Sequence, residues 1–137
     1  MVVSGSRQPT ADSRPTAIRH DVASDGYRLH YRHWRPAGLP RGYVVALHGI
    51  QSHSGWYEFS SERLQEAGYD VRFLDRRGSG LNAEDRGHAA HADRLVNDVL
   101  QTLAEVRRER DRAASPVPIT LLGVSWGGKL AAVVAAR

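Results

Sequence analysis

Three short apolar runs, separated by helix-like segments, constrain the fold of this 137-residue chain most strongly. The runs are residues 44–47, 71–74 and 119–122, and their apolar residues are nearly continuous rather than alternating with polar ones. Strands that are buried on both faces have this pattern, and such strands belong to parallel sheets. Residues 56–67 and 91–112 lie between the runs and are predicted helices.

Two further strand-like runs, residues 17–23 and 27–34, come before these three and flank the pair Asp25-Gly26. An Asp-Gly pair between strand-like runs is a strong signal for a β-hairpin. The second run alternates apolar and polar residues, which predicts a half-buried edge strand. With a final apolar helix at residues 129–137, the element order predicts an open, mainly parallel α/β sheet that begins with a β-hairpin.

Composition excludes several classes of protein. The formal charge is +4, but residues 48–137 hold twelve basic and twelve acidic groups, so the excess lies before them. No basic face for nucleic acid is therefore expected. The chain has no cysteine, which excludes disulfides and thiolate chemistry.

The N-terminal segment also bears on the location of the protein. Residues 1–15 are mostly polar and are predicted to be a disordered tail. They contain no apolar core of a secretory signal, and no run in the chain approaches the roughly 18 apolar residues of a membrane span. We therefore expect a cytoplasmic protein without a stable membrane span.

Gly123-Val124-Ser125-Trp126-Gly127 matches the pattern G-x-S-x-G. It directly follows an apolar strand and precedes a predicted helix, which is the strand-turn-helix setting of a nucleophile elbow. Gly123 and Gly127 remove Cβ atoms that would collide across this sharp turn, and Gly128 lets the helix pack close to the strand. The pattern predicts that the Ser125 hydroxyl lies at a helix N-terminus, where negative charge is favoured. A glycine-rich turn with an incidental serine is the alternative.

His48-Gly49-Ile50-Gln51 follows the first apolar run. Acyl transfer to a serine needs backbone N–H donors aimed at the tetrahedral oxyanion. We expect these donors to be the amides of Ile50 and Trp126, with Gly49 permitting the backbone path. His48 is interpreted as a structural loop residue, because the base follows the serine in the chain order of such folds.

Asp75-Arg76-Arg77-Gly78-Ser79-Gly80 follows the second apolar run. We expect Asp75 to accept backbone N–H bonds that shape this loop, and Gly78 and Gly80 to supply turns. The dinucleotide pattern G-x-G-x-x-G is incomplete, because its third glycine is replaced by Ala83.

A histidine pair is the remaining candidate for binding a metal. His88 and His91 are three residues apart and could share a helix face, but no third ligand accompanies them. They are interpreted as solvated side chains, so no metal site is expected.

In this order and spacing the three motifs resemble the α/β-hydrolase family over roughly residues 17–137. The nearest group is the monoacylglycerol lipases, lysophospholipases and serine aminopeptidases S33, whose HG-x-x-x-H-S-x-x-Y, D-x-x-G-x-G and G-x-S-x-G-G patterns are similar to residues 48–57, 75–80 and 123–128. The resemblance implies a serine ester hydrolase with Ser125 as nucleophile and the Ile50 and Trp126 amides as oxyanion hole. Its substrate would be a small acyl ester, such as a monoacylglycerol or lysophospholipid, and it would need no cofactor.

The resemblance also implies what else such an enzyme needs. Family members are about twice as long and add strands, a cap, an acid and a histidine after the elbow helix. We therefore expect residues 16–137 to be the N-terminal portion of an α/β-hydrolase domain, truncated after that helix and inactive by itself. Residues 119–122 would then form an exposed apolar sheet edge. The alternatives are a non-catalytic α/β fragment or interaction module, and completion by a separate C-terminal half.

Overall fold

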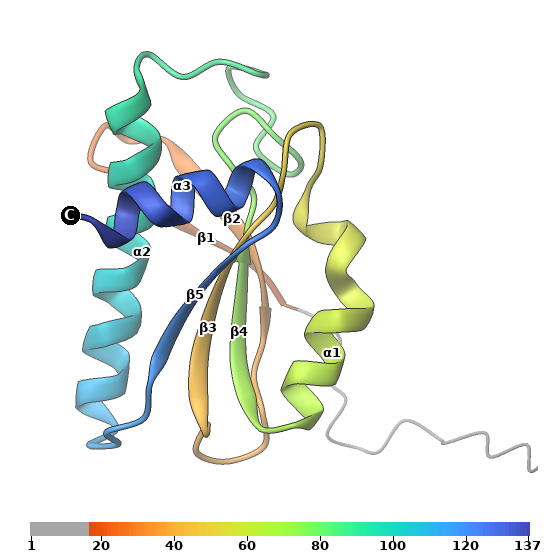
Figure 1. Cartoon of the computed structure of the whole chain (residues 1–137), viewed down its shortest axis with the longest axis vertical. Helices are drawn as coiled ribbons and strands as arrows, with labels where there is room; N and C mark the ends of the chain where they lie inside the picture. The colour runs from red at the N-terminus through yellow and green to blue at the C-terminus, as the bar shows by residue number, and fades with distance from the viewer. Residues whose placement is uncertain (1–16) are drawn as a thin grey trace, which may run out of the picture.

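Residues 17–137, which a computed structural model describes, form a five-stranded sheet with helices on both faces (Figure 1). The predicted disordered tail lies outside these residues. The strands are β1 (Ala17–Val22), β2 (Arg28–Trp34), β3 (Gly42–Leu47), β4 (Tyr69–Leu74) and β5 (Ile119–Gly123). The helices are the 3-10 turn η1 (Ser54–Tyr57), α1 (Glu58–Glu66), α2 (Ala92–Arg112) and α3 (Trp126–Ala135).

The strand order in the sheet is β1-β2-β4-β3-β5. Strand β3 pairs in parallel with both β4 and β5, so the three apolar runs are parallel neighbours, as their composition predicts. The hairpin strands β1 and β2 are antiparallel, and β2 joins β4 in antiparallel register. The sheet is therefore mixed, with the hairpin on one side of a parallel core.

The prediction that residues 27–34 form an edge strand is wrong. Strand β2 lies between β1 and β4, so β1 takes the outer position. Alternating burial is equally typical of an interior antiparallel strand with one half-exposed face. At the other side β5 is an edge strand of the described sheet, and Leu122 on it is 37% exposed. The exposed apolar edge expected at residues 119–122 is thus observed.

Strand β3 supplies the centre of the core because its side chains alternate between two helix layers. Val44 and Ala46 pack with Phe73 on the face that α1 covers. Val45 packs with Val106 of α2 on the opposite face. Figure 1 shows α1 on one side of the sheet and α2 and α3 on the other. All six β3 residues are buried, which explains their continuous apolar run.

The helix ends differ in detail from the prediction. The segment predicted at 56–67 is the turn η1 followed by α1, and it ends before Gly68, which has φ +99° and closes the helix as a C′ glycine. Helix α2 has Asp93 in its first turn and arginines in its last, an order that suits the helix dipole. His88 and His91 precede α2 and are exposed, so they do not share a helix face.

Arg77 fastens the hairpin to the rest of the fold. Its guanidinium is buried and bonds the Asp98 carboxylate of α2 at 2.9 and 3.0 Å and the Asp25 carboxylate of the hairpin turn at 2.8 and 3.1 Å. The hydrogen bond from Arg77 lowers the pKa of Asp25 to about 2. The same guanidinium lies 4.3 Å from the centre of the Tyr27 ring. Arg77 therefore links the loop after β4 to the hairpin turn and to α2.

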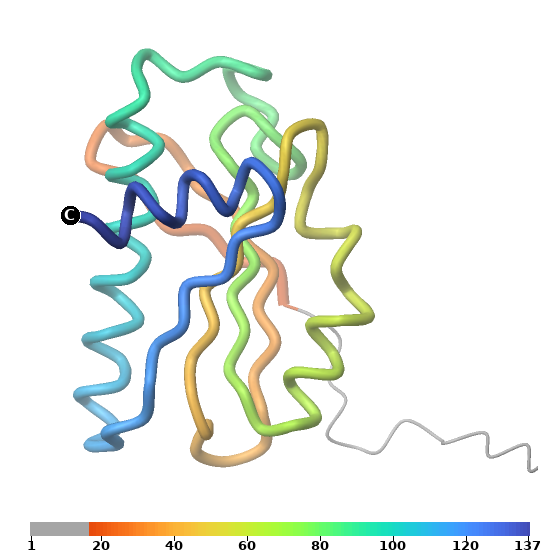
Figure 2. The backbone as a smooth tube through the Cα atoms, in the orientation of Figure 1, coloured from red at the N-terminus to blue at the C-terminus, as the bar shows by residue number. Residues whose placement is uncertain are grey.

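The parallel register brings three loops together at one end of the sheet. Leu47 is paired with Leu74 on one side and with Gly123 on the other. The loops that follow β3, β4 and β5 therefore start side by side, as the tube in Figure 2 shows at its upper end. This is the edge where α/β sheets place ligands and reacting groups.

Candidate active site

Ser125 occupies a strained turn between β5 and α3. It is the N-cap of α3 with φ 55° and ψ −120°, a conformation that residues with a Cβ atom rarely adopt. The turn is closed by a hydrogen bond from the Gly127 amide to the Val124 carbonyl at 2.9 Å. The Ser125 residue is exposed. Its hydroxyl group is thus presented at the start of a helix rather than packed into the core.

Two glycines make this turn sterically accessible. A Cβ atom at Gly123 would lie 2.4 Å from the Gly127 carbonyl oxygen, and one at Gly127 would lie 2.5 Å from the Leu47 carbonyl oxygen. These distances are far inside van der Waals contact, and the obstructing atoms are backbone. A Cβ at Gly128 would meet the Gly123 oxygen at 3.4 Å, an ordinary contact. The steric requirement therefore falls on Gly123 and Gly127.

The loop after β3 lies against Ser125. A Cβ at Gly49 would come within 3.3 Å of the Ser125 Cβ and 3.8 Å of its Oγ. Ile50 follows directly and its side chain is 63% exposed. Among the hydrogen bonds of residues 17–137, none is donated by the Ile50 amide. Gln51 has φ 52°, a left-handed conformation that the residue type does not signal in the sequence.

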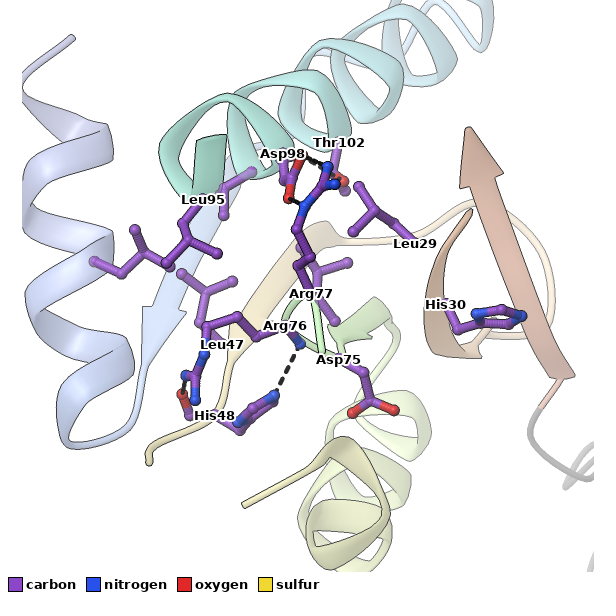
Figure 3. A pocket seen from close by; sticks show the side chains of 13 residues that line it. Leu29, His30, Leu47, His48, Asp75, Arg76, Arg77, Leu95, Asp98 and Thr102 are labelled. Carbon is purple, nitrogen blue, oxygen red and sulfur yellow. Dashed lines mark hydrogen bonds and ion pairs between the residues drawn. The ribbon is translucent and has the colours of Figure 1, made fainter. Parts of the chain in front are cut away.

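His48 is buried and both of its ring nitrogens are engaged. The Arg76 amide donates to Nε2 at 2.9 Å (Figure 3), so Nε2 is unprotonated. The proton is therefore on Nδ1, which donates to the Gly49 carbonyl at 2.8 Å. Burial lowers the pKa of His48. A neutral histidine with no free nitrogen holds a loop and is not available as a base for Ser125.

Asp75 connects the loops after β3 and β4. Its Oδ1 accepts the Ser54 amide at 2.7 Å and its Oδ2 accepts the Leu81 amide at 2.9 Å. Gly80 has φ +55°, and a Cβ there would lie 2.5 Å from Asp75 Oδ2. Gly78 has φ +72°, and a Cβ there would lie 2.5 Å from the Asp85 carbonyl oxygen. The carboxylate thus fixes the start of η1 and its own loop at once.

Arg76 is a site residue that sequence reasoning missed. Its guanidinium lies 4.6 Å from the centre of the Trp126 ring. Its Nη atoms donate to the carbonyl oxygens of His48 and Gly49 at 3.4 Å. Burial lowers the pKa of this guanidinium. An arginine in a loop carries no signal of such contacts, because they depend on how three distant loops meet.

A small cavity lies beneath the site, between the sheet and α2. Leu47, Leu74, Val99 and Leu130 contribute to its apolar part, and Figure 3 shows His48 and Arg76 on its polar side. Its volume is about 30 Å³, which is enough for a single water molecule. Ser125 does not line it. The cavity is therefore too small and wrongly placed to hold an ester substrate.

Residues 17–137 offer neither a metal site nor a membrane-spanning helix. No group of three or more His, Asp or Glu side chains in this range is arranged to hold a metal ion. Within the same range, every helix is too short or too polar to cross a bilayer.

The chain is similar in sequence to several known proteins. A model of the serine aminopeptidase S33 family matches residues 38–137. The monoacylglycerol lipase of Mycolicibacterium smegmatis is 34% identical over 123 residues, covering 89% of this chain and 42% of the lipase. Human monoglyceride lipase is 32% identical over 120 residues, covering 88% of this chain and 38% of the lipase. The chain thus spans about two fifths of the length of these relatives.

Solved structures share the fold of this chain. A lipase in its open form superposes with a TM-score of 0.75 at 25% identity, covering 90% of this chain and 40% of the lipase. A soluble variant of monoglyceride lipase from Saccharomyces cerevisiae, in complex with a substrate analogue, gives a TM-score of 0.73 at 21% identity. That alignment covers 88% of this chain and 39% of the yeast protein.

Proposed function

Because the chain belongs to the serine aminopeptidase S33 family of α/β-hydrolases, we propose that it carries the nucleophile and the oxyanion hole of a serine ester hydrolase. The observation that carries the proposal is the strained turn of Ser125, with φ 55°, at the N-terminus of α3 and against Gly49. A serine has no structural reason to occupy such a conformation, and strain of this kind is concentrated at reacting residues.

The proposed reaction begins with attack of Ser125 Oγ on the ester carbonyl carbon, while the hydroxyl proton passes to a general base. The carbonyl oxygen becomes an oxyanion and accepts hydrogen bonds from the Ile50 and Trp126 amides. Collapse of the intermediate breaks the bond to the alcohol, which leaves with the proton. Water then releases the acyl group from Ser125 as a carboxylic acid.

The general base of this reaction is not His48, whose two nitrogens are occupied. In the chain order of this fold the acid and the base follow the serine. Residues 126–137 contain no His, Asp or Glu. A polypeptide of residues 1–137 is therefore expected to react through Ser125 much more slowly than one that also supplies these two groups.

For the substrate we propose a small acyl ester of the monoacylglycerol or lysophospholipid type. The names of the relatives, monoglyceride and monoacylglycerol lipase, support this class. The 30 Å³ cavity is too small for an acyl chain. We therefore propose that residues outside this cavity bind the acyl chain and select its length.

Covalent labelling with a fluorophosphonate probe tests the nucleophile. We expect the probe on Ser125, located by peptide mass spectrometry, at a rate at least about tenfold above that of Ser60, because an oxyanion hole contributes roughly 100-fold or more. Ser60 is a matched internal control, an exposed serine whose hydroxyl only donates to the Tyr57 carbonyl. Ser125→Ala should abolish the labelling and Ser60→Ala should not. Equal labelling of Ser125 and Ser60 would instead favour a non-catalytic α/β module.

A further inference from the structure

The peptide between Gly49 and Ile50 is held at its carbonyl end. The Gly49 oxygen accepts the His48 Nδ1–H at 2.8 Å and both Nη groups of Arg76 at 3.4 Å. This peptide is trans, because residues 17–137 contain no cis bond. In a trans peptide the C=O and N–H point in opposite directions. Groups that fix the Gly49 carbonyl therefore also fix the direction of the Ile50 amide.

Arg76 contacts the second half of the oxyanion hole as well. Its guanidinium lies 4.6 Å from the centre of the indole ring of Trp126, whose amide is the other expected donor. Its own amide holds His48 in the tautomer that bonds Gly49. One residue in the loop after β4 thus touches the loop after β3 and the first residue of α3.

Ion pairing does not explain this placement. Within residues 17–137 the Arg76 guanidinium forms no salt bridge, and its hydrogen-bond acceptors are main-chain carbonyls. The neighbouring Arg77, by contrast, is paired with Asp25 and Asp98. A partly buried guanidinium without a carboxylate is unusual, because charge is costly to remove from water without a partner.

We propose that Arg76 is a positioning residue of the oxyanion hole, which clamps the Gly49 carbonyl and the Trp126 indole so that the Ile50 and Trp126 amides converge on one oxygen. This inference rests on the proposed function. Arg76 does not touch the reacting atoms itself, and it acts through the two residues that it contacts. Misaligned donors weaken stabilisation of the oxyanion without changing how substrate first binds.

The test compares Arg76→Ala and Arg76→Lys with the unchanged chain. We expect Arg76→Ala to lower the maximal rate of Ser125 labelling about tenfold to a hundredfold, with little change in the probe concentration for half-maximal rate. Arg76→Lys keeps the charge but not the planar stacking group, so its maximal labelling rate should lie between those of Arg76→Ala and the unchanged chain. Arg86→Ala is the matched control, since Arg86 is exposed and also donates to a carbonyl of this loop, that of Gly80.

A second measurement separates this inference from the proposed function. NMR of the Gly49 carbonyl carbon and the Ile50 amide reports the clamped peptide whether or not Ser125 reacts. Both resonances should shift in Arg76→Ala and stay in place in Arg86→Ala. If Ser125 fails to label in the unchanged chain, the proposed function falls while NMR still tests the clamp. Unshifted resonances, or Arg76→Ala labelling at the unchanged rate, would overturn the positioning role. If Arg76→Ala does not fold, Arg76→Lys carries both measurements.

Discussion

Replacing Ser125 by glycine should stabilise the folded chain while removing its nucleophile. The φ of 55° and ψ of −120° at this position cost a residue with a Cβ atom about 1–3 kcal/mol. Glycine adopts this conformation without that strain, but it adds about 0.4–1 kcal/mol of unfolded-state entropy. The net expectation is that Ser125→Gly is more stable than Ser125→Ala by about 1 kcal/mol. Both variants lose the hydroxyl, so their difference in stability reports the backbone strain reduced by this unfolded-state entropy.

Urea denaturation followed by circular dichroism measures this difference. With a slope of about 1–3 kcal/mol per molar, the midpoint of Ser125→Gly should lie roughly 0.3–1 M above that of Ser125→Ala. Ala132→Gly is the control, because Ala132 is exposed within α3 and glycine there should destabilise by about 0.5–1 kcal/mol. A midpoint for Ser125→Gly at or below that of Ser125→Ala would refute the assignment of strain to Ser125.

Three further changes test the neighbouring groups. Gly127→Ala places a Cβ 2.5 Å from the Leu47 carbonyl, so it should destabilise by about 1–3 kcal/mol or more; a urea midpoint equal to that of the unchanged chain would contradict the steric role of Gly127. Asp75→Asn puts an NH₂ group opposite the Ser54 or the Leu81 amide and should lower the free energy of unfolding by about 1.5–3 kcal/mol. A urea midpoint equal to that of the unchanged chain would show that these two hydrogen bonds do not stabilise the fold. Burial lowers the pKa of His48, so the unfolded chain binds its proton first and stability should fall as pH drops below about 6.5. His48→Gln should flatten that fall in urea midpoints measured between pH 7 and 5, and an unchanged slope would exclude His48 as its source.

The parallel core and the positions of the motifs were predictable from the sequence. Continuous apolar runs report burial on both faces, and this is how β3 is placed at the centre of the sheet. The glycines of the elbow indicate a steric requirement, since a Cβ atom at Gly123 would lie 2.4 Å from the Gly127 carbonyl oxygen. In both cases a local sequence pattern follows from a local physical constraint, so the constraint can be predicted without knowing the fold.

The remaining features depend on contacts between distant segments. The place of β2 was mistaken because its alternation fits an interior antiparallel strand as well as an edge. Helix α3 begins at Trp126 rather than at residue 129. The low helix propensity of Gly127 and Gly128 argues against helix there, but both residues lie in its first turn, where a Cβ at Gly127 would clash with the Leu47 carbonyl. The contacts of Arg76 with Gly49 and Trp126 span 27 and 50 positions of sequence, and no pattern along the chain records them.

The register of β3 with its two neighbours has a consequence for how this site tolerates change. Leu47 lies in register between Leu74 and Gly123, so the spacing of the three loops is set by main-chain hydrogen bonds that hold neighbouring strands about 4.8 Å apart. Side chains that cover the sheet can be exchanged without altering that spacing, provided that they still fill the core. A lipase that is 25% identical in sequence can thus superpose with a TM-score of 0.75. The backbone ladder keeps the loops in place while sequences diverge around it.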